Sequence, residues 1–334
     1  MLSKAQFLKH LSLLVLTIQT TTLVMVLRYS RISSGDNSGH YVSSTAILLS
    51  EIIKLMVCLL ILLYQTNGSL TSLTQLLRKE VMAKPGETAK LLIPALLYTI
   101  QNNLLFLALT NLDAATYQVT YQLKILTTAL FSVLMLHKRL ALNQWLSLVL
   151  LMIGVTLVQW PQSETQSQPK DISSDELETA ISVVIDEPLG NRLIGLLAVL
   201  ASCFSSGFSG VYFEKLVKYT SQSLWIRNTQ LALFSVITAT IAMCVQDFDL
   251  IYINGFFQGY TTLTWIVVLL QAFGGLVVAL VMKYADNILK GFATSISIVL
   301  STVCSYYLMT DFYPTTSFLS GASIVIAANI LYAF

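Results

Sequence analysis

The chain has 334 residues, of which 55% are hydrophobic and 11% are charged, whereas ordinary soluble domains carry about 25% charged residues. This small number of charges cannot cover the surface of a water-soluble fold of this length. Lipid must therefore surround most of the chain. The formal net charge of +2 and the lack of a basic run also exclude a nucleic-acid-binding protein. The sequence therefore predicts an all-α membrane protein.

Ten segments are apolar enough to cross a membrane as helices, which takes about 20 residues each. In chain order they are residues 9–27, 44–64, 90–109, 115–136, 143–160, 191–213, 225–245, 263–283, 288–309 and 315–333. The first ends in Arg28–Tyr29–Ser30–Arg31 instead of a small-residue cleavage site, so we expect a retained span and not a signal peptide. The sixth contains the run Ser205–Gly210, whose small side chains favour close helix packing.

One long polar stretch, residues 161–190, separates the fifth span from the sixth. It is rich in Asp, Glu and Pro, a composition typical of a flexible linker. It divides the chain into a first five-span half, residues 1–160, and a second five-span half, residues 191–334. Because five is an odd number, the second half must run inverted relative to the first, an arrangement that recurs in transporters.

The distribution of Lys and Arg predicts the orientation, because basic residues gather in cytoplasmic loops. If the N-terminus is cytoplasmic, that side holds Lys4, Lys9, Arg78, Lys79, Lys84, Lys138, Arg139, Lys215, Lys218 and Arg227. The other side then holds Arg28, Arg31, Lys170 and Arg192. We therefore expect both termini in the cytoplasm and the acidic linker on the opposite side. The sequon Asn67–Gly68–Ser69 then faces the cytoplasm and stays unglycosylated.

A lysine near the same place in each half forms a short internal repeat. Lys124 and Lys290 each follow a leucine and precede a threonine by four residues, Thr128 and Thr294, and about half of the chain separates them. A lysine at the centre of a span costs about 2.5–3.5 kcal/mol on insertion scales, so it usually faces a cavity or a partner. The alternative is a side chain that extends to the membrane interface. The matched pair predicts an anion site shared by the two halves.

Other polar side chains accompany these lysines. Tyr117, Tyr121, Lys124 and Thr128 are spaced four, three and four residues apart, so they share one helical face. The amides of residues 101–103 interrupt the third span and either line a polar cavity or bond a neighbouring helix.

Two acid–base pairs also lie within or beside the spans. Glu51 and Lys54 are three residues apart, and Asp286 and Lys290 are four apart, so each pair shares a helical face and can form an ion pair. For Glu51 and Lys54, a structural role and a functional one are equally open.

The residue types present favour binding over catalysis. Cysteines and histidines show no metal-ligand spacing, and no phosphate-binding loop occurs, so we expect no metal, no cofactor and no catalytic residues. Two cations, several tyrosines and several amides suit a phosphate-bearing solute with an aromatic part, such as a nucleotide conjugate. A phosphorylated metabolite remains open on this chemistry.

These residues lie in long strings that resemble the nucleotide-sugar transporters of the Golgi, within the drug/metabolite transporter superfamily. The strings are residues 97–103, 111–124, 210–215, 225–228 and 283–292, and the resemblance runs from about residue 9 to 333. It implies ten spans in two inverted five-helix repeats, cytosolic termini, a Golgi membrane location, and exchange of a cytosolic nucleotide sugar for a lumenal nucleoside monophosphate.

The resemblance also implies roles for individual residues. Lys124 and Lys290 match phosphate-binding lysines of the family, and Glu51 and Lys54 match a polar pair near the sugar. The positions that match the nucleotide pocket are Tyr98, Gln101, Asn102, Tyr117 and Asn228. Tyr121 joins them because it shares the helical face of Lys124.

Within the family, residues 127–132 and 293–295 resemble the branches that carry UDP-sugars, and residues 113–116 and 159–161 resemble the UDP-N-acetylglucosamine branch. UDP-galactose and CMP-sialic acid are the alternatives. The resemblance leaves open a homodimer or a complex with related transporters or glycosyltransferases.

A different class of function, a membrane-embedded enzyme or a scaffold without transport, also stays open. Its main support is Asp247–Phe248–Asp249, which has the spacing of the metal-binding acids of glycosyltransferases. No other acid lies near them in sequence, which favours an ordinary solvated loop.

Overall fold

The computed structural model describes residues 4–33, 41–159, 189–308 and 315–333. Every regular element in these ranges is a helix, as the sequence predicts. The acidic linker expected at residues 161–190 lies outside the described residues, apart from its last two.

The helices follow one another along the chain with short connections. They are α1 (Lys4–Ser33), α2 (Ser43–Gln65), α3 (Leu70–Leu77), the π-helix η1 (Arg78–Met82), α4 (Pro85–Ala89), α5 (Leu92–Asn111), α6 (Ala114–Tyr121), α7 (Leu123–Leu136), α8 (Leu142–Val158), α10 (Leu189–Lys218), α11 (Leu224–Gln246), α12 (Phe248–Asn254), α13 (Thr262–Tyr284), α14 (Asn287–Leu308) and α15 (Thr316–Ala333).

Nine stretches of the described chain are long and apolar enough to cross a membrane, one fewer than the sequence predicts. The difference concerns the fifth predicted span, residues 143–160, which forms α8. This apolar helix ends at Val158 and has 17 residues, so it is about 25 Å long, at the short end of what spans a bilayer. The fourth predicted span, residues 115–136, consists of two helices, α6 and α7.

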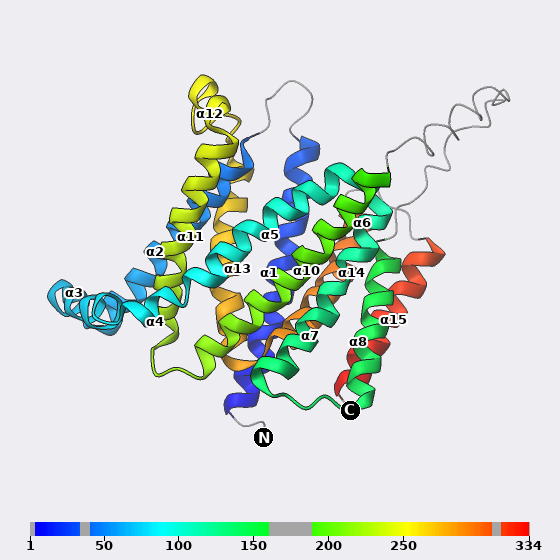
Figure 1. Ribbon diagram of the computed structural model, residues 1–334, viewed down its shortest axis with the longest axis horizontal. Coiled ribbons are helices and arrows are strands. Elements are labelled where there is room, and N and C mark those ends of the chain that lie inside the picture. The colour runs from blue at the N-terminus through cyan, green and yellow to red at the C-terminus, as the bar shows by residue number, and fades with distance from the viewer. Residues whose placement is uncertain (1–3, 34–40, 160–188, 309–314, 334) are drawn as a thin grey trace.

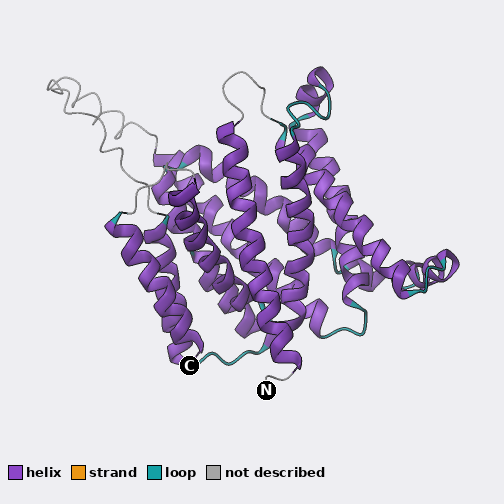
Figure 2. Ribbon diagram, turned by 180° about the vertical axis from the view of Figure 1, so that it is seen from behind, coloured by secondary structure: helices purple, strands orange, loops and turns teal. Residues whose placement is uncertain are grey.

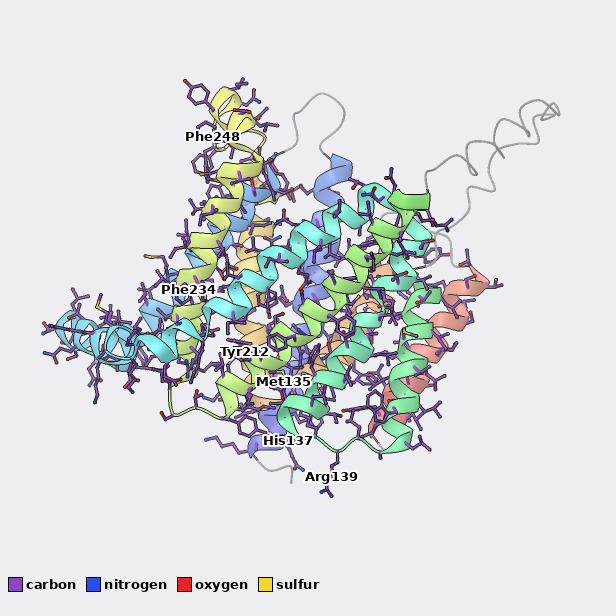
Figure 3. The ribbon with its side chains drawn as sticks, in the orientation of Figure 1. Met135, His137, Arg139, Tyr212, Phe234 and Phe248 are labelled. Atoms are coloured by element: carbon purple, nitrogen blue, oxygen red, sulfur yellow. The ribbon has the colours of Figure 1, made fainter. Side chains whose placement is uncertain are left out.

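The long helices form one bundle in which elements from the two halves of the chain alternate (Figures 1 and 2). Helix α5 packs on α10, α2 on α11, and α8 on α15, while α1 packs on both α13 and α14. Helix α7 contacts α10 and α14. The start of α1 and the end of α15 lie at one end of the bundle, and α12 lies at the other (Figure 1). Figure 3 places His137 and Arg139, just after α7, at the end that holds the termini.

Helix α10 approaches α7 and α14 closely because two of its residues lack side chains. A Cβ atom at Gly207 would lie 2.9 Å from the backbone of Thr127 and Thr128 in α7. A Cβ atom at Gly210 would lie 2.5 Å from the amide nitrogen of Asn287, the first residue of α14. The close packing expected from the small-residue run is confirmed, and α10 thus fixes the two helices that carry Lys124 and Lys290.

The segment formed by α3, η1 and α4 extends sideways from the bundle (Figures 1 and 2). It is held by the start of α11, where the fully buried Arg227 donates to the carboxylate of Glu87 at 2.8 Å. Gln222 donates to the backbone carbonyl of Glu80 at 2.8 Å. A hydrogen bond from Lys84 lowers the pKa of the Glu80 carboxyl, because the ammonium group favours the ionised acid. These bonds join the first half of the chain to the second.

Helices α8 and α15 meet through glycines on both sides. A Cβ atom at Gly154 would lie 2.9 Å from the side chain of Val325, and one at Gly321 would lie 2.7 Å from the backbone nitrogen of Val158. Such contacts let two helix backbones touch, which is how van der Waals packing holds helices together in lipid.

We expect Gly321→Ala to lower the thermal unfolding temperature of the purified protein in detergent, because the added methyl group meets backbone atoms that cannot rotate away. Overpacking of this kind costs about 1–3 kcal/mol. Gly86→Ala is the matched control, since a Cβ atom there meets no atom within 4 Å. Equal unfolding temperatures for the two variants would contradict the close crossing of α8 and α15.

A second prediction concerns the start of α6, the helix that carries Tyr117 and Tyr121. Asp113 precedes this helix, and its carboxylate accepts the backbone N–H of Thr116 at 2.8 Å. That bond lowers the pKa of the Asp113 carboxyl. Asp113→Ala removes this cap and should cost about 1 kcal/mol, whereas Asp113→Asn keeps it. The unfolding temperature in detergent should fall for Asp113→Ala and stay unchanged for Asp113→Asn. The same fall in both variants would show that loss of the cap is not the cause.

Candidate substrate-binding site

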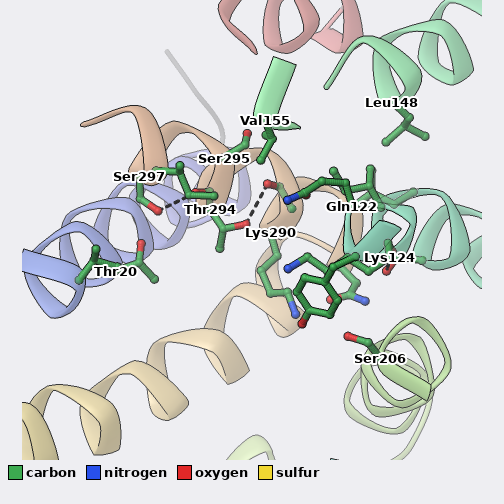
Figure 4. Close-up of a pocket in the computed structure, with 18 residues that line it drawn as sticks. Thr20, Gln122, Lys124, Leu148, Val155, Ser206, Lys290, Thr294, Ser295 and Ser297 are labelled. Atoms are coloured by element: carbon green, nitrogen blue, oxygen red, sulfur yellow. Dashed lines mark hydrogen bonds between the residues drawn. The ribbon is translucent and has the colours of Figure 1, made fainter. Parts of the chain in front are cut away.

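Lys124 and Lys290 line one cavity of about 370 Å³ inside the bundle. Figure 4 shows both side chains extending into it from different helices, α7 and α14. Within the described chain, no carboxylate lies within 4.0 Å of either ammonium group, since the ion pairs found there involve other lysines and Arg227. Two like charges therefore share a partly enclosed space, which favours the entry of an anion.

Two tyrosines, Tyr117 and Tyr121, lie on the same face as Lys124. The Lys124 ammonium lies 3.9 Å from the centre of the Tyr121 ring, a cation–π contact. The rings of Tyr121 and Tyr117 stack with centroids 5.7 Å apart and an interplanar angle of 8°. The structure thus brings together the cation and the two aromatic side chains whose spacing suggested a common face. A flat aromatic group is the natural partner of such a stack.

The helix that carries Lys124 is interrupted at Gln122, whereas the sequence predicts one continuous span over residues 115–136. Helix α6 ends at Tyr121 and α7 begins at Leu123. The Gln122 side chain donates to Oε1 of Gln159 at the end of α8, at 2.8 Å, and this bond holds the junction in place. Lys124 consequently lies in the first turn of α7, where the helix dipole also favours an anion.

Hydroxyl groups line much of the remaining wall of the cavity. None of them is among the binding residues predicted from the sequence. They belong to Thr20, Thr128, Ser206, Thr294, Ser295 and Ser297. For three of these residues the sequence spacing indicates a place in the cavity wall. Thr128 follows Lys124 by four residues, and Thr294 and Ser297 follow Lys290 by four and seven. Each therefore lies on the same helical face as its lysine. For Thr20, the signal was the polar run of residues 19–22 inside an apolar span.

Tyr98 and Gln101, expected in the nucleotide pocket, do not line this cavity. Gln101 lies within hydrogen-bonding reach of Tyr121. Tyr98 lies within reach of Ser209 on α10. Both residues are carried by α5.

The remaining expected residues are dispersed. Asn102 is exposed on α5. Asn228 is buried in α11, and its amide nitrogen has no hydrogen-bond partner among the described protein groups. Glu51 and Lys54 form the ion pair that their spacing suggests, and the Lys54 side chain packs against Gly275 of α13. These four residues do not line the cavity of the two lysines.

One ion pair that the sequence spacing allows, between Asp286 and Lys290, is not formed. Asp286 lies four residues before Lys290, yet its carboxylate binds Lys138 at 3.2 Å and not Lys290. Lys138 follows α7 and is far from Asp286 in sequence, yet it binds the Asp286 carboxylate in place of Lys290.

The acids with glycosyltransferase-like spacing do not form a metal site with other described residues. Asp247 ends α11 and Asp249 lies in the first turn of α12. Among the residues that the structure describes, no third His, Cys, Asp or Glu joins them in a group able to hold a metal ion.

Comparison with known proteins agrees with a transport site. A model of the family "Nucleotide-sugar transporter" matches residues 4–333. The UDP-N-acetylglucosamine transporters of Canis lupus familiaris and Homo sapiens are each 54% identical over 98% of this chain and 95% of the relative. The UDP-galactose translocator of Bos taurus is 47% identical over 98% of this chain and 78% of the relative.

A solved protein crystal structure has a similar fold, with a TM-score of 0.62 at 14% identity over 96% of this chain and 97% of the other. At that identity the likeness concerns the fold alone. The family match covers the whole described bundle, including both cavity lysines. The chain belongs to the nucleotide-sugar transporter family and is a transporter, not an enzyme.

Proposed function

We propose that this protein carries UDP-N-acetylglucosamine across the Golgi membrane and that Lys124 and Lys290 bind its diphosphate. The observation that carries the proposal is the shared cavity, in which the two ammonium groups lie without a carboxylate within 4.0 Å among the described residues. A diphosphate supplies the missing negative charge and accepts charge-assisted hydrogen bonds from both lysines. The choice of sugar rests on the relatives at 54% identity.

The rest of the nucleotide has suitable partners around the lysines. The uracil ring stacks on the Tyr117–Tyr121 pair, which already presents parallel aromatic faces. Gln101, beside Tyr121, and Tyr98 then read the edge of the base or the ribose. In this proposal Asn102 and Asn228 complete the nucleotide pocket, and the Glu51–Lys54 pair lies towards the sugar, once the helices have moved around the substrate.

The proposed architecture is ten spans in two inverted repeats, residues 1–160 and 191–334, on either side of the linker. The pattern of helix contacts supports it. If each helix is matched with its counterpart in the other half, the contact of α5 with α10 corresponds to that of α13 with α1. In the same way, the contact of α10 with α7 corresponds to the contact of α1 with α14. Such paired contacts follow from a two-fold relation between halves.

Transport in this proposal is exchange by alternating access, with UMP from the lumen as the counter-substrate. Each half moves relative to the other around the lysine pair, which both halves contribute. An empty site leaves two cations close together in a weakly polar cavity, which opposes closure, while either UDP-sugar or UMP relieves that repulsion. The start of α1 and the end of α15 lie at one end of the bundle, which supports placing both on the same side of the membrane, and the distribution of Lys and Arg favours the cytoplasmic side.

We expect purified protein in liposomes to take up radiolabelled UDP-N-acetylglucosamine, and Lys124→Gln or Lys290→Gln to reduce uptake about tenfold or more, because each variant loses a hydrogen bond to a charged group. Lys215→Gln, an exposed lysine on α10, is the control and should transport normally. The substrate panel includes UDP-galactose and CMP-sialic acid. A preference for UDP-galactose would overturn the choice of sugar, and no uptake of any nucleotide sugar by the wild-type protein would overturn the function.

The exchange mechanism predicts a second outcome in the same liposomes. UMP loaded inside should accelerate uptake of the UDP-sugar about tenfold or more relative to empty liposomes, because ligand-free closure is opposed by repulsion of the two lysines. UMP added only outside should compete and inhibit. Equal uptake with and without internal UMP would contradict obligatory exchange while leaving transport itself intact.

A further inference from the structure

The chain after α7 places a lysine across the boundary between the two halves. His137 ends α7 in the left-handed conformation, with φ 53° and ψ 31°, which turns the chain away from the helix axis. Lys138 then reaches the second half and contacts two of its acids. Its ammonium group lies 3.0 Å from Oε1 of Glu214 on α10 and 3.2 Å from Oδ2 of Asp286, the residue before α14.

Glu214 is the fully buried centre of this cluster. One oxygen accepts from Lys138 and also from Lys218, at 2.8 Å, and the other accepts the backbone N–H of Asn287 at 2.8 Å. Lys218 donates in addition to the backbone carbonyl of Ala285. The two lysines and the acids Glu214 and Asp286 balance in charge, so burial of the carboxylate is compensated.

Asp286 has both of its oxygens engaged. Oδ1 accepts the backbone N–H of Leu289 at 2.8 Å and so caps α14. Oδ2 is bound by Lys138. Without Lys138, this carboxylate is free to form the ion pair with Lys290 that a four-residue spacing allows in a helix. In the structure that pair is not formed, and Lys290 extends into the cavity instead (Figure 4).

We propose that Lys138 is a positioning residue for substrate binding: it holds the Asp286 carboxylate and thereby leaves the Lys290 charge available to the phosphate of the substrate. This inference rests on the proposed function, because it needs Lys290 to bind phosphate. The physical reason is competition, since an ion pair in a weakly polar cavity is stronger than one in water. A phosphate that must displace Asp286 binds less tightly than one that meets a free ammonium group.

The test compares the dissociation constant of UMP for full-length purified variants by isothermal titration calorimetry. Lys138→Gln should weaken binding about twofold to fivefold, the range that corresponds to one partly solvated ion pair. Adding Asp286→Asn in the same chain should restore wild-type affinity, because Asn keeps the helix cap but has no charge to offer Lys290. Arg139→Gln removes a neighbouring exposed charge and should change nothing.

A purely structural role for Lys138 predicts a different result, namely weakening that persists or grows in the double variant. That result, or wild-type affinity in Lys138→Gln, overturns the proposal. If Lys138→Gln does not fold, the affinity of the single variant Asp286→Asn for UMP is the test. The proposal expects this variant to bind UMP at least as tightly as the wild type, and weaker binding contradicts it.

A second readout does not depend on the substrate. Labelling of lysine amines followed by mass spectrometry should show slower modification of Lys290 in Lys138→Gln than in the wild type, with recovery in the double variant, because an ion-paired ammonium group reacts more slowly. Unchanged labelling would contradict the proposal. If the wild-type protein fails to bind UMP, the proposed function fails, while the labelling of Lys290 still decides whether Lys138 keeps it unpaired.

Discussion

The site depends on one electrostatic constraint: an ammonium group in a membrane-embedded cavity needs a counter-charge, and Lys124 and Lys290 have no carboxylate within 4.0 Å among the described residues. Other cations inside the bundle are neutralised. Lys54 pairs with Glu51, Arg227 with Glu87, and Lys138 with Glu214 and Asp286. Lys124 and Lys290 differ from these paired cations, and they lie where both halves of the chain meet.

The packing of the bundle keeps these two charges in place. Gly207 brings α10 against the backbone of α7, and Gly210 brings it against the Asn287 side chain at the start of α14, so the two lysine-bearing helices share one support. Tight contacts of this kind transmit small movements, because a close-packed interface changes between discrete arrangements and does not deform gradually. In the proposed mechanism, a ligand that draws Lys124 and Lys290 together therefore acts directly on the helices that move during transport.

Much of this organisation follows from the sequence, because spans in lipid need long apolar runs and because a helix repeats its face every three to four residues. The common face of Tyr117, Tyr121 and Lys124 needed only that periodicity. The interruption at Gln122 could not be predicted, because the bond from Gln122 at this junction is to Gln159 on another helix. The pair of Asp286 and Lys290 is a similar case: local spacing permits it, but Lys138, remote in sequence, binds the acid in the folded protein. Tertiary partners, absent from any local pattern, decided both cases.

The most direct measurement of the central claim is an experimental structure of the protein with UMP bound. If both lysines bind the substrate, the phosphate should lie between α7 and α14, with oxygens about 3 Å from Nζ of both Lys124 and Lys290, and the uracil should stack on Tyr121 or Tyr117. A phosphate bound at Lys54 or at the surface, with the ammonium groups of Lys124 and Lys290 free of the ligand, would contradict it.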